Sequence, residues 1–212
     1  MDSRPLRHVD LHTSTGRLEA LYREIERPVG VAVVAHPHPL GGGTLHNKVV
    51  FRAARGLEAA GIATIRFNFR GVGASQGKHE QGDGEQADFE AALNWIIGRH
   101  PGAKVIAGGF SFGAWVGSRV ACTRADVDAV FLIGAPINKY NLVYLKRCDK
   151  PLLFIHGSRD EFGDAERLGE LAEHCMDAEM VLVSGADHFF KDQLDIVEAT
   201  LTEWATRIAE GG

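Results

Sequence analysis

One short motif has the residue types of an activated serine. It reads Gly109-Phe110-Ser111-Phe112-Gly113, which is G-x-S-x-G between an apolar run and a segment compatible with a helix. A strand that turns sharply into a helix strains its serine and brings backbones close together, so residues without a Cβ are needed on both sides. A glycine-rich turn without chemistry would show the same letters. The strand-turn-helix context favours Ser111 as a nucleophile.

A serine hydroxyl is a weak nucleophile at neutral pH and needs a base that a third residue orients. Asp160 follows the apolar run PLLFIHG, and His188 follows AEMVLVSG. The order serine, aspartate, histidine differs from the orders of the chymotrypsin and subtilisin types. Asp187 and Asp164 are alternative orienting acids, but Asp187 adjoins the histidine and would point elsewhere. We therefore expect Ser111 as nucleophile, His188 as base and Asp160 as orienting acid.

Hydrophobic periodicity predicts the elements that position these residues. Between 6 and 25, two segments alternate apolar and polar residues, which is typical of a half-exposed β-hairpin. Six later apolar runs are typical of strands buried on both faces of a parallel sheet: VGVAVVAH, IATIRFNF, KVIAGGF, VDAVFLIGA, PLLFIHG and AEMVLVSG. Helical patterns lie at 45 to 60, 84 to 98 and about 192 to 209.

Alternating strands and helices predict an α/β fold with a mostly parallel central sheet, an N-terminal antiparallel hairpin and helices on both faces. Gly61 is placed to end the first helix, and Asp83 with Gln86 predicts a capping-box-like start of the second. We expect one domain over 1–212, because no linker or repeat interrupts the pattern. The three candidate residues would then face one crevice at the carboxyl ends of their strands.

The chain resembles a lidless member of the α/β-hydrolase superfamily, in the dienelactone-hydrolase-like esterase group. The resemblance runs from Val29 to the last helix and rests on HPHPLGGGTLHNKVV, FNFRGVGASQG, HGSRD and GADHFF besides the serine motif. It implies the α/β-hydrolase fold. Because only about fifteen residues, 136 to 150, separate the sixth and seventh strands, we expect no lid domain. Dienelactone hydrolases use a cysteine where this chain has Ser111, so their specificity is not carried over.

Acyl transfer also needs hydrogen-bond donors for the oxyanion that forms on the substrate. The N–H of Phe112 is the first candidate. The second is expected in the HPHPLG segment, where neither proline has an N–H. The N–H of His38 is our first choice and that of Leu40 our second. In related hydrolases the donor sits two residues after the histidine that closes the third strand, and His36 matches that histidine.

Other polar residues have competing interpretations. His36, His38 and His46 lie close in sequence, but no carboxylate joins them at ligand spacing, so we expect no metal. Arg70 could bind an anionic group of the substrate, or it could hold loop carbonyls or pair with an acid. Its neighbouring glycines lack the third glycine of a dinucleotide fingerprint, so we expect no cofactor.

Aromatic residues also surround the serine in sequence. Packing is their default role, but Phe112 and Phe189 are candidates for an apolar substrate pocket.

Bulk properties narrow the class of partner. The 212 residues carry a net charge of -5 with acids and bases intermixed, which argues against nucleic acid and anionic membranes. Cys122, Cys148 and Cys175 are odd in number and far apart, which predicts no disulfide framework and favours a reducing cytosol. There is no secretion signal or long apolar segment, so a cytoplasmic protein is expected. An edge strand or the 136 to 150 connection offers a surface for a homodimer.

Together these features predict a serine hydrolase that cleaves small carboxylic esters, with thioesters as a further option. A peptidase or a cofactor-free haloperoxidase could use the same three residues, because a fold and a triad do not define a substrate. A catalytically silent scaffold for protein contacts is the alternative outside enzymes.

Overall fold

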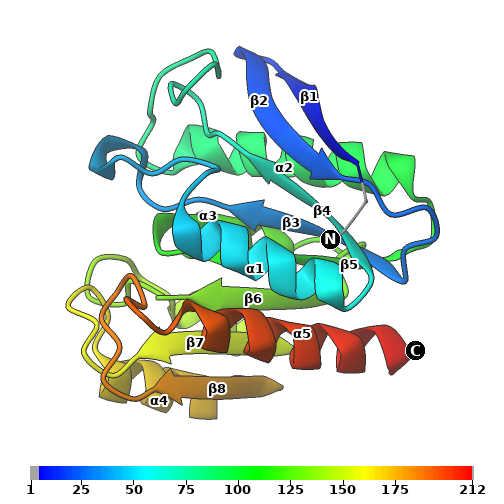
Figure 1. The fold of residues 1–212 in the computed structure, drawn as a ribbon. Coiled ribbons are helices and arrows are strands. Elements are labelled where there is room, and N and C mark those ends of the chain that lie inside the picture. The colour runs from blue at the N-terminus through cyan, green and yellow to red at the C-terminus, as the bar shows by residue number, and fades with distance from the viewer. Residues whose placement is uncertain (1–4, 212) are drawn as a thin grey trace.

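The computed structural model describes residues 5–211, and within them eight strands form one twisted sheet (Figure 1). The strands are β1 (Leu6–Thr13), β2 (Gly16–Arg23), β3 (Gly30–Ala35), β4 (Ile62–Phe67), β5 (Lys104–Phe110), β6 (Ala129–Ile133), β7 (Leu152–Gly157) and β8 (Ala178–Val183). Their order is β1-β2-β4-β3-β5-β6-β7-β8. β2 pairs antiparallel with both β1 and β4, and all pairs from β4 to β8 are parallel. The predicted hairpin and mostly parallel sheet are confirmed.

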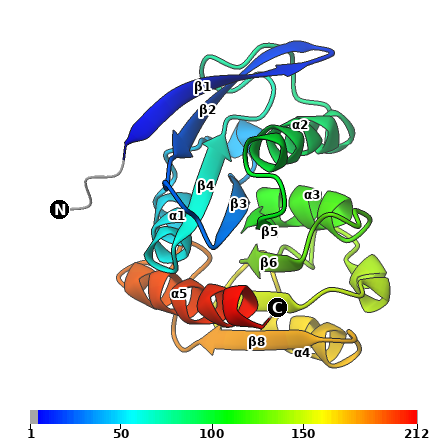
Figure 2. The same cartoon turned by 90° about the vertical axis from the view of Figure 1, so that its right-hand side faces the viewer.

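Helices cover both faces of the sheet (Figure 2). They are α1 (Lys48–Ala59), α2 (Asp83–Arg99), α3 (Phe112–Ala121), α4 (Ala165–Glu173) and α5 (Leu194–Glu210), with short 3-10 turns at η1 (Pro39–Gly41) and η2 (Val143–Arg147). α1 and α5 pack on one face, where Val50, Leu201 and Trp204 are buried. α2, α3 and α4 pack on the other, over a second apolar core. Burial of both sheet faces explains why the central strands are nearly continuous apolar runs.

Two helix ends show how local sequence sets the boundaries. α1 begins after Asn47, whose side-chain oxygen accepts the N–H of Val49 at 2.9 Å, and it ends before Gly61, which has a φ of 82°. The predicted start of α2 was wrong in detail. Its cap is Gly82, whose N–H donates to Glu85 Oε2 at 2.7 Å, so Glu85 takes the place expected of Gln86.

The last predicted strand differs from the others in burial. β8 is the edge of the sheet, and Leu182 is 51% exposed. The expectation that this strand is buried on both faces was therefore wrong, because it has a hydrogen-bonded neighbour on one side only. The apolar residues still locate this strand in the sequence, and the loop that follows β8 carries His188.

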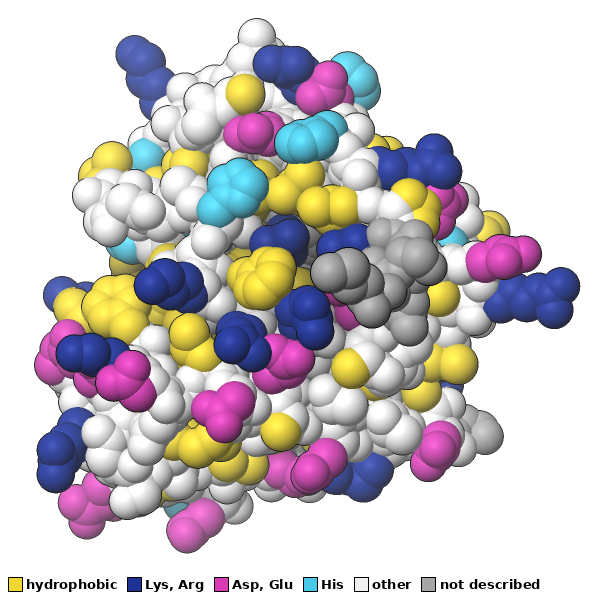
Figure 3. Space-filling model, in the orientation of Figure 1, with side chains coloured by type: hydrophobic (Ala, Val, Ile, Leu, Met, Phe, Trp, Pro, Cys, Tyr) yellow, Lys and Arg dark blue, Asp and Glu magenta, His cyan; other side chains and the backbone are white. Residues whose placement is uncertain are grey.

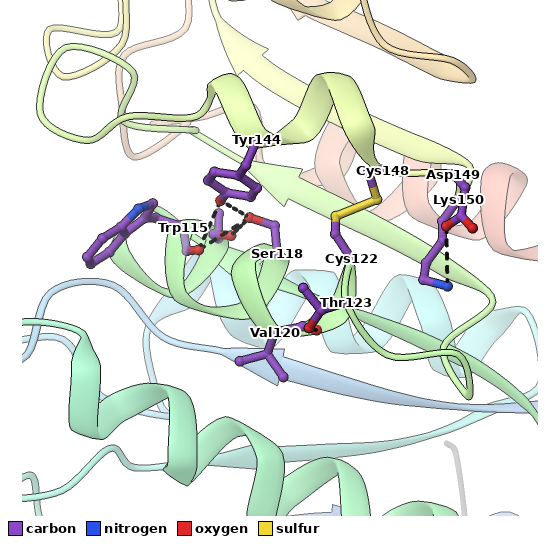
Figure 4. The surroundings of a disulfide bond; sticks show 10 residues. Trp115, Ser118, Val120, Cys122, Thr123, Tyr144, Cys148, Asp149 and Lys150 are labelled. Carbon is purple, nitrogen blue, oxygen red and sulfur yellow. Dashed lines mark hydrogen bonds and ion pairs between the residues drawn. A yellow bond between two sulfur atoms is a disulfide. The ribbon is translucent and has the colours of Figure 1, made fainter.

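Cys122 and Cys148 form a disulfide, so the expectation that the cysteines are unpaired was wrong (Figure 4). Cys122 lies at the end of α3 and Cys148 follows η2; the two are 26 residues apart, with Cα atoms 5.2 Å apart. Cys175 is free. The expectation of a reducing compartment rested on unpaired cysteines and loses that support.

Basic and acidic side chains are interspersed on the face formed by α1 and α5 (Figure 3). Within residues 5–211, none of the helices combines the length and apolar character needed to cross a membrane.

Candidate active site

Ser111 occupies a strained turn between β5 and α3. Its φ of 55° and ψ of -118° lie outside the regions that most residues adopt. A Cβ on Gly109 would lie 2.6 Å from the carbonyl oxygen of Ala35, and one on Gly113 would lie 2.5 Å from that of His36. Glycine is therefore required on both sides of the serine, as the G-x-S-x-G motif predicts. The turn leaves the hydroxyl at the carboxyl end of β5.

The three candidate residues of the triad meet at this point. His188 Nε2 lies 2.9 Å from Ser111 Oγ, and His188 Nδ1 lies 2.7 Å from Asp160 Oδ2. A carboxylate oxygen can only accept, so Nδ1 donates to Asp160 and Nε2 is left to accept the serine proton. His188 and Asp160 are 3% and 9% exposed. The hydrogen-bond donors and acceptors are thus arranged as an activated serine requires.

The rival acids are used elsewhere. Asp187 Oδ1 accepts the backbone N–H groups of Phe189 and Lys191, both at 3.1 Å. Asp164 caps α4 by accepting the N–H of Arg167 at 2.9 Å. Neither carboxylate contacts the base, so the structure brings only Asp160 of the three to His188.

The loop after β3 provides the candidate oxyanion donors. Among the described residues, the N–H groups of Phe112 and His38 have no acceptor within the protein. The N–H of Leu40 donates to His38 Nδ1 at 3.2 Å, so it is already engaged. The His38 and Phe112 rings lie 4.8 Å apart. The geometry therefore favours His38 over Leu40 as the partner of Phe112 in an oxyanion hole.

His36 holds this loop through both of its ring nitrogens. Its ring is fully buried; Nε2 accepts the N–H of Phe69 at 3.0 Å, and Nδ1 donates to the carbonyl of Pro37 at 2.6 Å. Burial lowers the pKa of His36 to about 4, so the ring is neutral at physiological pH. Within residues 5–211, no cluster of three His, Cys, Asp or Glu side chains has the arrangement of metal ligands.

A pocket of about 390 Å³ opens above the serine. It is lined by Ser111, His188 and the predicted residues Phe112 and Phe189, together with Pro37, His38, Leu40, Gly41, Gly42, Gly43, Asn47, Pro136, Lys139, Tyr140 and Phe162. Its volume lies in the range of small-molecule sites.

Arg70 does not line this pocket, and its placement there was wrong. Its side chain is 3% exposed; Nη2 lies 2.8 Å from Asp88 Oδ1, and Nη1 lies 2.7 Å from Glu80 Oε2. Hydrogen bonding to Asp88 raises the pKa of Arg70. A buried guanidinium paired in this way fixes the loop after β4 and lies outside the pocket.

Comparison with known proteins decides the family. Residues 30–210 match the family model described as an alpha/beta hydrolase domain. The chain belongs to the α/β hydrolases. It is 33% identical over 204 residues to the uncharacterized protein RP471 of Rickettsia prowazekii, covering 91% of this chain and 86% of that protein.

Solved structures agree with this family assignment. An alpha-beta serine hydrolase homologue from Coxiella burnetii superposes with a TM-score of 0.87 at 32% identity, covering 93% of this chain and 96% of that one. A serine hydrolase without a lid, XC6422 from Xanthomonas campestris, gives a TM-score of 0.86 at 30% identity, covering 98% and 96%. A protein of unknown function from Agrobacterium tumefaciens gives 0.89 at 30% identity, covering 97% of each chain.

The pocket of this α/β hydrolase also contains residues that were not predicted from the sequence. Lys139 and Tyr140 come from the connection between β6 and β7, and Phe162 comes from the loop after β7. Both loops follow the carboxyl ends of predicted strands, which is the signal that could have found them. The connection holds only the short turn η2, and it forms a wall of the pocket without covering it.

Proposed function

We propose that this α/β hydrolase cleaves small carboxylic esters through an acyl-enzyme on Ser111, with His188 as base and Asp160 as orienting acid. The continuous hydrogen-bonded line from Ser111 Oγ through His188 to Asp160, at the floor of an open pocket, is the observation that supports this function best. Thioesters are the next class to test, because they undergo the same acyl transfer.

The reaction follows from these positions. Ser111 Oγ attacks the ester carbonyl carbon while its proton passes to His188 Nε2, and the carbonyl electrons move onto oxygen. The N–H groups of Phe112 and His38 stabilise that oxyanion. Collapse breaks the bond to the alcohol oxygen, which takes the proton from His188. A water molecule then gives a proton to His188 and attacks the carbonyl carbon of the acyl-enzyme. The bond to Ser111 Oγ breaks, the acid leaves, and Oγ takes the proton back from His188.

The oxyanion donors account for a large part of the expected rate. One such donor typically contributes about 2.7 to 4 kcal/mol to transition-state stabilisation. Both donors proposed here are backbone groups, and proline cannot replace them without altering the loop. The position of the His38 donor therefore depends on the residues that hold its loop, among them the fully buried His36.

Small substrates suit the shape of the site. The pocket holds about 390 Å³, and aromatic rings from Phe112, Tyr140, Phe162 and Phe189 form much of its wall. The short 136 to 150 connection adds no apolar lid surface for a long acyl chain. Short aryl or alkyl esters match this space better than long-chain lipids do.

Labelling with a fluorophosphonate tests the proposal directly. We expect covalent modification of Ser111, located by mass spectrometry, and hydrolysis of 4-nitrophenyl acetate by the wild type. Ser111→Ala and His188→Ala should abolish both signals. Ser184→Ala removes an exposed serine and serves as the matched control that keeps both. A folded wild type that is neither labelled nor active would contradict the proposal and favour the silent scaffold.

A further inference from the structure

The side chains that line the pocket above Ser111 carry a net positive charge. Among the described residues that line it, Lys139 has the only permanent charge, and no aspartate or glutamate contributes to the wall. The carboxylate of the triad, Asp160, lies behind His188 with no exposed side-chain surface. A substrate in the pocket therefore meets a cation with no competing anion beside it.

Backbone hydrogen bonds hold Lys139 in a tight turn. The N–H groups of Lys139 and Tyr140 both donate to the carbonyl of Pro136, at 2.9 and 3.0 Å. This tight turn begins at Pro136, shortly after β6 ends at Ile133. The neighbouring Tyr140 ring stacks on Trp115 of α3, with centroids 4.0 Å apart and planes 12° apart. The turn is thus held against the helix that starts at the nucleophile.

The ammonium of Lys139 lies over the ring of Phe162, which neighbours the base. Its Nζ is 5.1 Å from the centre of the Phe162 ring, and that ring is 4.6 Å from the ring of His188. No carboxylate of the described residues lies within ion-pair distance of Nζ. The lysine is therefore positioned by an aromatic ring that touches the base, and its charge has no ionic partner in the described chain.

The charge of Lys139 affects His38, which also lines the pocket. Burial lowers the pKa of His38, and the nearby His79 and the charge of Lys139 lower it further, while the carboxylate of Glu85 acts in the opposite direction. His38 belongs to the loop that carries the proposed oxyanion donor. The charge of Lys139 thus acts on a residue of the loop on the other side of Ser111.

A second cavity lies against the same wall. It measures about 520 Å³ and shares Lys139 and Tyr140 with the pocket above Ser111. Lys146 and Arg167 also line it, against a single acid, Glu170. Cationic side chains therefore outnumber anionic ones in the cavity that borders Lys139 on its other side.

We propose that this site takes esters that carry a carboxylate a few atoms from the scissile carbonyl, next to an aromatic or apolar group, and that Lys139 selects for that charge. This inference rests on the ester hydrolysis proposed above. The rings of Phe112, Tyr140 and Phe162 hold the apolar part, while the lysine binds the carboxylate. Lys139 is a specificity-determining residue and takes no part in the chemical step.

Two pairs of aryl esters test the inference. The first pair, 4-carboxyphenyl acetate and 4-carbamoylphenyl acetate, places the charge on the alcohol side. The second, 4-nitrophenyl 4-carboxybenzoate and its carboxamide analogue, places it on the acyl side. Each pair has the same shape and differs in charge, and its intrinsic reactivity is the same for every enzyme variant. The measured quantity is the ratio of kcat/KM for the carboxylate to kcat/KM for the carboxamide.

We expect Lys139→Met to lower this ratio roughly 3- to 10-fold for at least one pair, because an ion pair that solvent can reach contributes modestly to binding. Lys139→Glu should lower the ratio further, because the glutamate repels the carboxylate. Any effect of the substitution on the shape of the pocket acts on both esters of a pair, so it cancels in the ratio. Lys104→Met makes the same charge change at the opposite end of β5 and should leave the ratio unaltered. Raising the ionic strength above about 0.1 M should lower the ratio in the wild type but not in Lys139→Met.

The outcomes separate this inference from the proposed function. Ratios that are equal in the wild type, Lys139→Met and Lys139→Glu for both pairs, with Ser111-dependent hydrolysis intact, would overturn the selective role of Lys139 alone. Failure to hydrolyse any of the four esters would contradict ester hydrolysis itself, and this inference with it. A fall for one pair only supports the inference and identifies which side of the ester carries the charge.

Discussion

Asp160 presents one carboxylate oxygen to His188 and the other to the backbone. Oδ2 lies 2.7 Å from His188 Nδ1, while Oδ1 accepts the N–H of Phe162 at 2.8 Å and that of Gly163 at 3.2 Å. The carboxylate cannot rotate without breaking these bonds. Its orientation is therefore set before a substrate arrives, and it determines which nitrogen of His188 carries the proton.

Asp160→Asn should trap the wrong tautomer of the base. The two backbone donors require the amide oxygen, so the amide NH2 group must face His188 and donate to Nδ1. The imidazole proton then moves to Nε2, which can no longer accept the proton of Ser111. We expect kcat for 4-nitrophenyl acetate to fall by about 10³ to 10⁴ with the fold intact by circular dichroism.

Asp187→Asn is the matched control for this substitution. Its side-chain oxygen can still accept the N–H groups of Phe189 and Lys191, and it does not contact the base. Its kcat should remain near that of the wild type. An Asp160→Asn enzyme that kept a kcat within tenfold of the wild type would show that the orientation of His188 does not depend on this carboxylate.

Gly113→Ala should disturb the turn that presents the nucleophile. The new Cβ would lie 2.5 Å from the carbonyl oxygen of His36, which belongs to a buried strand end that cannot move aside cheaply. We expect a loss of about 1 to 3 kcal/mol in the free energy of unfolding and slower fluorophosphonate labelling of Ser111. Urea denaturation and the labelling rate measure the two effects.

Gly98→Ala provides the contrast within the same chain. Gly98 lies near the end of α2, and a Cβ there would meet nothing within 4 Å. This variant should be more stable than the wild type by about 0.5 to 1 kcal/mol, with unchanged labelling. Equal effects of the two substitutions would mean that the close approach at Gly113 is not what requires glycine.

The meeting of Ser111, Asp160 and His188 could be predicted from sequence because each of these residues follows a strand or its short loop. Ser111 follows β5, Asp160 follows β7 and His188 follows β8. Parallel strands bring their carboxyl ends to one edge, so residues 77 positions apart come within 2.9 Å. The periodic pattern that locates the strands therefore locates these side chains too.

The contacts of long side chains could not be predicted in the same way. Arg70 follows β4 at the same edge, yet Asp88 of α2 turns its guanidinium into the interior. Lys139 lies in an irregular connection, where no periodicity says which way a side chain points. Cys122 and Cys148 meet because α3 packs against η2, and the spacing of the cysteines in the sequence does not indicate this pairing.

Removing the disulfide should lower stability without removing the pocket. The bridge closes a loop between residues 26 positions apart, which corresponds to about 2 to 4 kcal/mol in the free energy of unfolding. Tyr144 and Ser118, whose hydroxyl oxygens lie 2.7 Å apart beside the bridge, still connect η2 to α3 (Figure 4). We expect urea denaturation of the double variant Cys122→Ser/Cys148→Ser to show this loss, with ester hydrolysis retained.

Cys175→Ser is the control, because that thiol forms no bridge. It should leave the unfolding midpoint close to that of the wild type, and reductant should destabilise this variant as it does the wild type. Thiol titration of protein unfolded without reductant should find one reactive cysteine; finding three would contradict the pairing.

The buried neutral state of His36 should make the fold sensitive to acid. Burial lowers its pKa in the folded protein from 6.5 to about 4. Near pH 7 the ring is largely neutral in both states and contributes little to the pH dependence. As the pH falls below 6.5, the unfolded chain binds a proton that the folded chain does not, so unfolding becomes more favourable until about pH 4. Between pH 7 and pH 5 this corresponds to a loss of about 2 kcal/mol.

Urea denaturation of the wild type and His36→Gln at the two pH values isolates this contribution. The glutamine can replace the hydrogen bonds to Phe69 and Pro37 but cannot titrate, so the variant should lose about 2 kcal/mol less than the wild type on going from pH 7 to pH 5. If the variant fails to fold, NMR of the wild-type imidazole gives the same information, with His36 still neutral at pH 5. Equal losses in both proteins, or a His36 ring protonated at pH 5 in the folded state, would contradict the role of burial.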